Sequence, residues 1–120
     1  MLSTKKLLYK IIGAFGANGT YVTASTGIDG GLRLWRDRAN GTVRCYGHFR
    51  KSSDIAKETA LFEIPSGYRP NDTYTVPMFM ATASSSTAYY GIVTTAGIMT
   101  QSLGNTIRAG IVCGEWAYAE

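Results

Sequence analysis

The sequence predicts an all-β domain, an antiparallel β-sandwich or jelly-roll-like fold with a short N-terminal helix. The 120 residues include 14 glycines and 8 tyrosines, and many of the others are threonine or serine. Such a composition is typical of β proteins with many turns. After residue 13, apolar and polar residues alternate with a period of two in short segments. Turn residues separate these segments at intervals of roughly ten residues, which favours an antiparallel sandwich or barrel.

A chain of this length forms one domain and can bury a core without metals or disulfides. We expect residues 1–12 to form a short helix used for oligomerisation or docking, and residues 13–120 to form the β domain. Ser3 can cap the helix, and its apolar residues recur at helical spacing: Leu7, Leu8, Ile11 and Ile12. So short a helix is not stable alone, so we expect it to pack against its own domain, another domain or copies of itself. A signal peptide is the alternative, but Lys10 interrupts the apolar stretch that it requires.

Two strands joined by a tight loop form the clearest hairpin. Residues 19–25 predict a separate, earlier strand. The hairpin begins with residues 32–37, whose side chains alternate between two faces. Asn40 and Gly41 then predict a two-residue loop with positive φ at both positions. In the next strand, residues 42–50, one set of side chains points inward and the other outward. The inward set is Val43, Cys45, Gly47 and Phe49, and the outward set is Arg44, Tyr46, His48 and Arg50.

A stiff corner, "FEIPSGYRP", follows a polar loop predicted over residues 51–58 and a strand predicted over residues 59–64. Pro65 ends the strand because proline has no N–H to donate to a ladder. Gly67 permits the chain to reverse, and Pro70 keeps Arg69 extended. The corner therefore holds the two side chains before its last proline, Tyr68 and Arg69, in reproducible positions.

Four more strands complete an up-and-down series over residues 73–83, 88–95, 98–101 and 106–120. Pro77 marks an edge or a bulge within the first of them. The polar residues 84–87, "SSST", predict a turn before the second.

The residues needed for catalysis are scarce. His48 is the only histidine, and no carboxylate lies near it at strand-neighbour spacing. Hydrolase, phosphate-loop and metal-binding motifs are absent from the sequence. We therefore expect no enzyme, no catalytic residue, no metal and no cofactor. Cys45 and Cys113 lie far apart in strand-like segments and have no CxxC spacing, so we expect reduced, buried thiols.

The charge of the chain is unevenly distributed. Residues 32–51 carry six basic side chains and one acidic one, within a net charge of +4. Such a stretch can attract nucleic acid. The interpretation that we favour is a solvated strand face whose charges keep sheet edges from pairing, because no nucleic-acid motif accompanies it. We expect binding to neither nucleic acid nor the interior of a membrane.

A binding surface is the more plausible functional feature. Sugars stack on aromatic rings, and arginine supplies directional hydrogen bonds. The alternating strand 42–50 points cationic and aromatic groups to one side, and two adjacent tyrosines follow the polar turn 84–87. The predicted ligand-binding residues are Arg44, Tyr46, His48, Tyr89 and Tyr90.

Three segments in order, "KKLLYKI", "LWRDRANGTVRCYGHF" and "FEIPSGYRP", resemble a known family. They are similar to small tail-associated proteins of phages and prophages of Gram-positive bacteria. They also resemble the C-terminal head, or receptor-binding, domains of phage tail-fibre and baseplate proteins. In that family the hairpin carries an acid and a tryptophan beside its cysteine, where this chain has Arg44 and Tyr46.

The resemblance implies a β-sandwich or jelly-roll-like domain, commonly a homotrimer, on the exterior of a virion made in the cytoplasm of a bacterial host. It implies other tail, baseplate or fibre proteins as partners, and a host cell-surface saccharide as ligand. The resulting expectation is a non-enzymatic tail or fibre head domain that attaches to a bacterial glycan. Two alternatives stay open: a structural trimerising cap, decoration or head-fibre module without a ligand, and a secreted carbohydrate-binding domain.

Overall fold

The computed structural model describes residues 19–119, which form eight β-strands. The all-β prediction is confirmed. The helix expected over residues 1–12 lies outside the described residues. The strands are β1 (Gly19–Thr23), β2 (Asp29–Asp37), β3 (Thr42–Ile55), β4 (Phe62–Glu63), β5 (Tyr74–Ala81), β6 (Ser86–Val93), β7 (Ile98–Gln101) and β8 (Ile107–Ala117).

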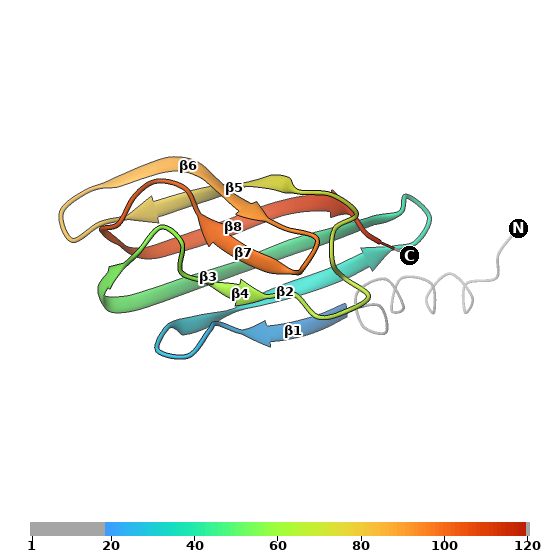
Figure 1. Cartoon of the computed structure of the whole chain (residues 1–120), viewed down its shortest axis with the longest axis horizontal. Helices are drawn as coiled ribbons and strands as arrows, with labels where there is room; N and C mark the ends of the chain where they lie inside the picture. Colours follow the sequence, from blue (N-terminus) through green and yellow to red (C-terminus); the bar gives the residue numbers. More distant parts are fainter. Residues whose placement is uncertain (1–18, 120) are drawn as a thin grey trace, which may run out of the picture.

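All eight strands belong to one antiparallel sheet with the order β1-β2-β3-β8-β5-β6-β7-β4 (Figure 1). The sheet curls until its two outer strands approach each other. The Ser25 N–H, just after β1, donates to the Leu61 carbonyl, just before β4, at 3.0 Å. Of the two arrangements that the sequence favours, the molecule therefore adopts a nearly closed barrel.

The alternation in β3 has the predicted orientation. Val43, Cys45, Gly47 and Phe49 are buried, and Arg44, Tyr46, His48 and Arg50 are exposed. Gly47 permits close approach of β2, because a Cβ there would lie 2.3 Å from the Gly31 carbonyl oxygen. Two strands flank β3, with Cys45 opposite Leu34 of β2 on one side and opposite Gly114 of β8 on the other.

Two predictions at the ends of β3 are wrong. Residues 51–55, expected in a loop, continue β3, and the register with β8 shifts between Arg50 and Ile55. Their polar sequence lacks the apolar–polar alternation that predicts a strand, because only Ile55 among them is buried. The β2–β3 loop spans residues 38–41 rather than two residues. Gly41, with a φ of 66°, is the one residue of this loop that has a positive φ. A longer loop needs the left-handed conformation at one position only.

Asp37 holds the β2–β3 loop in this form. Its carboxylate accepts the Asn40 backbone N–H at 3.2 Å and the Asn40 side-chain amide at 2.8 Å. Because these bonds favour the charged form, they lower the pKa of Asp37.

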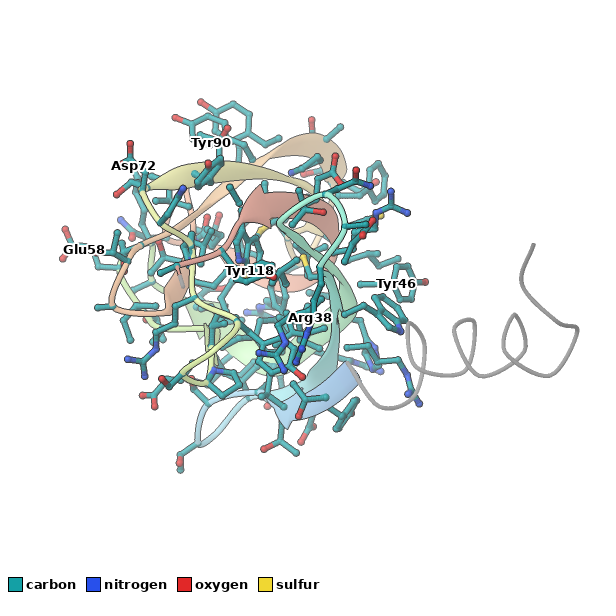
Figure 2. The ribbon with its side chains drawn as sticks, turned by 90° about the vertical axis from the view of Figure 1, so that its right-hand side faces the viewer. Arg38, Tyr46, Glu58, Asp72, Tyr90 and Tyr118 are labelled. Carbon is teal, nitrogen blue, oxygen red and sulfur yellow. The ribbon has the colours of Figure 1, made fainter. Side chains whose placement is uncertain are left out.

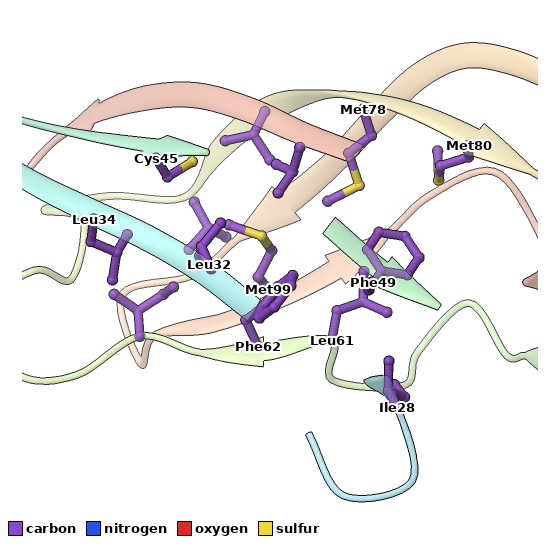
Figure 3. Packing of buried hydrophobic residues seen from close by; sticks show 14 of the residues in the cluster. Ile28, Leu32, Leu34, Cys45, Phe49, Leu61, Phe62, Met78, Met80 and Met99 are labelled. Carbon is purple, nitrogen blue, oxygen red and sulfur yellow. The ribbon is translucent and has the colours of Figure 1, made fainter. Parts of the chain in front are cut away.

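The core fills the inside of the barrel with side chains from every strand except β1 (Figure 3). The rings of Phe49 and Phe62 meet edge to face, with centroids 6.3 Å apart. The buried Gln101 is satisfied locally: its carbonyl accepts the Leu103 N–H at 2.8 Å, and its amide donates to Gly104. This pairing ties the β7–β8 loop to the barrel.

The corner at residues 64–70 covers one end of the core. The Arg69 Nε donates to the Ile64 carbonyl at 2.9 Å, which closes the corner on itself. The Nε1 of Trp116, a fully buried residue of β8, donates to the Tyr68 carbonyl at 2.7 Å. Gly67 adopts the positive φ, 91°, that the reversal requires. The corner therefore anchors the end of β8 to the segment between β4 and β5.

Candidate binding surface

The structure places three predicted site residues on the outside of β3. Arg44, Tyr46 and His48 are all exposed, and the Tyr46 side chain is 53% accessible. Arg44 forms a solvent-exposed ion pair with Glu115 of β8, with 3.4 Å between Nε and Oε2. Exposed pairs of this kind contribute little to stability. The guanidinium is therefore held near β8 but remains accessible to a ligand.

Neighbouring strands extend this group of side chains. Arg33 of β2 lies opposite Tyr46, and Trp35 lies opposite Arg44. The Arg33 guanidinium stacks over the exposed ring of Tyr21 on β1, with 5.6 Å to the ring centroid. The outer face thus carries tyrosine and arginine in alternation across three strands, and sequence analysis did not include Tyr21 or Arg33 among the predicted binding residues.

The other two predicted residues form a tyrosine pair on β6. The ring centroids of Tyr89 and Tyr90 are 4.6 Å apart, and the ring planes differ by 31°. Successive residues in a strand point to opposite faces. Tyr90 lies opposite the exposed Pro77, and Tyr89 lies opposite the buried Met78. Both tyrosines nevertheless remain accessible, at 45% for Tyr89 and 39% for Tyr90.

Tyr89 is exposed because this part of β6 has only one neighbour. β6 pairs with β5 along its whole length, but with β7 only from Gly91 to Val93. The Ser102 N–H donates to the Tyr90 carbonyl at 3.2 Å, so the backbone N–H and C=O of Tyr90 point toward the β7 side. By the alternation of an antiparallel ladder, the N–H and C=O of Ser86 and Ala88 point the same way, beyond the β7 pairing. Among the described residues, no strand pairs with this side of residues 86–88, where the Ala88 carbonyl accepts the Thr87 hydroxyl at 3.5 Å.

The five predicted residues do not form one cluster within a single chain. β8 and β5 lie between β3 and β6 in the sheet. Three strand spacings separate Tyr46 from Tyr90 by about 14 Å. Viewed along the barrel, Tyr46 and Tyr90 point to different sides (Figure 2). The structure therefore brings together a group of three residues and a group of two.

Apolar side chains that sequence analysis missed occupy the surface between the two groups. Phe79 of β5 is 53% accessible and Ile111 of β8 is 47% accessible, and these two residues lie directly opposite each other. Cys113, beside Tyr46 in the register, is also exposed. Strand parity could have located those on β8, because Val112 and Trp116 are evident core residues and the odd-numbered residues from Ile111 to Glu115 must then face outward.

The prediction of two buried thiols is therefore half wrong. Cys45 is buried and Cys113 is exposed, and both are free. Burial raises the pKa of the Cys45 thiol from an ordinary 9.0 to about 12. The two residues lie on adjacent strands but on opposite faces of the sheet, since Cys45 faces the core and Cys113 faces solvent. An intramolecular disulfide between them would require the backbone to move.

Two further features are absent from residues 19–119. No three side chains among histidine, cysteine, aspartate and glutamate gather there as a possible metal site. Residues 19–119 also contain no helix with the length and apolar character needed to cross a membrane.

Comparisons with models of known protein families and with curated proteins find no match to the chain.

Proposed function

We propose that this protein is a non-enzymatic phage virion protein, a tail or fibre head domain that attaches to a glycan on the surface of a bacterial host. The proposal includes a homotrimer on the virion exterior, joined to other tail, baseplate or fibre proteins. It combines the family resemblance of three sequence segments with the exposed aromatic and cationic side chains of the barrel.

The observation that carries the proposal is the tyrosine pair of β6. Two adjacent tyrosines with accessible rings are unusual in a regular strand, where one of them normally faces the core. Here both rings remain accessible, 4.6 Å apart, beside a turn rich in hydroxyl groups. Accessible ring faces next to hydroxyl groups supply both the stacking surface and the hydrogen-bonding partners that sugars use. Tyr89 and Tyr90 form one of the two proposed glycan-binding groups.

Arg44, Tyr46 and His48 form the second group. Their common strand fixes their direction, so a ligand does not have to order the backbone when it binds. Arginine donors suit hydroxyl, carboxylate or phosphate groups on a saccharide. Each group alone offers a small contact, and several copies in one assembly would multiply the strength of attachment.

One observation favours the alternative of a structural module without a ligand. Phe79 and Ile111 are exposed between the two groups and offer no hydrogen-bonding atoms. Surfaces of that kind are typical of contacts between proteins. A trimerising cap or decoration module would use the same face for assembly alone.

Two variants distinguish these functions. Tyr89→Ala and Tyr46→Ala should each reduce adsorption to Gram-positive cells and binding on a glycan array, while light scattering shows an unchanged assembly. Thr75→Ala is the matched control, because Thr75 is exposed on β5 and belongs to neither group. Loss of assembly in either variant would assign that residue to an interface instead. Normal adsorption and normal assembly by both variants would refute the proposed glycan-binding residues.

A further inference from the structure

The outer face of the barrel carries a compact apolar patch that spans three adjacent strands. Its members share one face of β5, β6 and β8, and the register places Ile111 opposite Phe79 and Phe79 opposite Ala88. The patch consists of Phe79, Ala88, Ala109, Ile111 and Cys113. None of these side chains can form more than a weak hydrogen bond. A contiguous exposed apolar surface rimmed by polar residues marks a site of protein contact.

Cys113 supports this interpretation independently of the large side chains. Free cysteine is among the residue types most often buried in proteins. Here its thiol is exposed, next to Tyr46 and inside the patch. A partner seated on the patch would bury the thiol together with Ile111 and Phe79.

The two sides of the patch differ in their chemistry. On the β3 side lies Arg50, an exposed cation and hydrogen-bond donor opposite Ala109. Arg50 forms no ion pair within the described residues. On the β6 side lies the open edge at residues 86–88, where the Ser86 carbonyl and the hydroxyls of Ser86 and Thr87 can accept hydrogen bonds. We call these the β3 flank (Arg50) and the β6 flank (residues 86–88).

The two flanks complement each other, and every copy of the chain carries both. Two β3 flanks placed together would bring cations against cations, which is unfavourable. A β3 flank against a β6 flank instead places donors against acceptors and covers an edge that is otherwise open to uncontrolled pairing. A second copy of the chain therefore satisfies the patch and both flanks at once.

We infer that the apolar patch is a homotypic interface, at which the β3 flank of one copy contacts the β6 flank of the next. The contact is heterologous, so it repeats from copy to copy and closes into a ring where the rotation allows. The strands β8 and β5 of the patch lie between β3 and β6 in the sheet, and Tyr46 of β3 and Tyr90 of β6 point to different sides of the barrel (Figure 2), so each copy can meet two neighbours. This interface lies in the β domain and does not rest on glycan binding.

The state of assembly tests the inference on the full-length chain. Sedimentation velocity at micromolar concentration should give wild-type protein a single mass that is a multiple of the chain mass. Phe79→Asp and Ile111→Asp should each give a monomer with the wild-type far-ultraviolet circular dichroism, because both side chains face solvent in the isolated barrel. Thr75→Asp places the same charge on the same face of β5 and should leave the assembly intact.

Cys113 provides a second measurement on the same proteins. A thiol reagent should label Cys113 of the Phe79→Asp monomer at least about tenfold faster than Cys113 of the wild-type assembly, because no neighbouring copy covers the thiol in the monomer. Arg50→Gln, which removes the charge of the β3 flank, should raise the dissociation constant of the assembly by about tenfold.

Three results would overturn the inference. A wild-type monomer at these concentrations excludes the interface. An assembly that survives both Phe79→Asp and Ile111→Asp is held elsewhere, for example by residues 1–12. An unchanged dissociation constant in Arg50→Gln refutes the contact between the flanks.

Discussion

At the scale of single residues, the two cysteines illustrate how strand parity controls chemistry. Cys45 and Cys113 lie on adjacent strands but face opposite sides of the sheet. Alkylation of the folded Phe79→Asp monomer should therefore label Cys113 alone, and alkylation of the wild-type protein in denaturant without reductant should label both cysteines. Intact-protein mass measurement checks the two numbers. The absence of any label in denaturant would mean a disulfide and would favour the secreted carbohydrate-binding domain.

The Cys45 thiol should also make the protein sensitive to alkaline pH. Its pKa is about 12 in the folded protein and 9.0 as an ordinary value, so the unfolded chain loses this proton first. Stability is unaffected below pH 9 and falls as pH rises from 9 to 12, by up to about 1.4 kcal/mol per pH unit. Urea unfolding should show a shallower alkaline decline for Cys45→Ala than for wild type. Cys113→Ala, the matched control, should keep the wild-type slope.

The exposure of a residue could be predicted where strand alternation alone decides on which face of the sheet its side chain lies. Alternation around Phe49 correctly places Tyr46 and His48 outside. The exposure of Tyr89 depends on where the pairing between β6 and β7 stops, which no local pattern encodes. The distance between Tyr46 and Tyr90 depends on the strand order. Hence the exposure of the β3 residues could be predicted, but the exposure of Tyr89 and the division of the candidate residues into two groups could not.

At the scale of elements, the corner at residues 64–70 should be a stabilising feature. Trp116→Phe removes the Nε1–H bond to the Tyr68 carbonyl and leaves a small cavity. We expect a loss of about 1–3 kcal/mol in the free energy of unfolding. Trp35→Phe is the control, because Trp35 is only half-buried and should cost less. Equal losses in chemical denaturation would contradict this role for the corner.

The strands could be predicted where apolar residues alternate, and β7 matches its predicted range, residues 98–101. The errors arise where tertiary contacts override the local pattern. Residues 51–55 are polar, yet they extend β3 because Ile55 reaches the core and pairs with Ile107. The predicted strand at residues 59–64 is reduced to Phe62–Glu63, the two residues that form a ladder with β7. The N–H groups of Leu61 and Ile64, on either side, donate to the Met99 and Gly97 carbonyls.

At the scale of the whole molecule, one curled sheet around one core should unfold as a unit. The Ser25–Leu61 hydrogen bond joins segments that flank β1 and β4, so the two edges of the sheet support each other. We expect near-ultraviolet and far-ultraviolet circular dichroism to report the same thermal transition at each protein concentration. Two separated transitions would mean that part of the barrel unfolds independently.

The strand order was beyond sequence analysis because it depends on contacts between distant segments. β8, the last strand, inserts between β3 and β5. Such pairing is not encoded in the turn residues, which connect only consecutive strands. The all-β class follows from composition and periodicity, whereas the closed form of the sheet follows from these long-range pairings.

The start of β1 and the end of β8 lie at the same end of the barrel, and the turn between β5 and β6 lies at the other (Figure 1). That turn is braced by its own polar groups: the Ser85 N–H donates to the Thr82 hydroxyl at 3.1 Å, and the Thr82 N–H donates to the Ser85 carbonyl at 2.8 Å. A carrier fused at either end of the described chain would therefore lie at the end of the barrel opposite the β5–β6 turn. A peptide epitope grafted between Thr82 and Ser85 would project from the other end, away from the carrier, which makes the domain a compact scaffold for display.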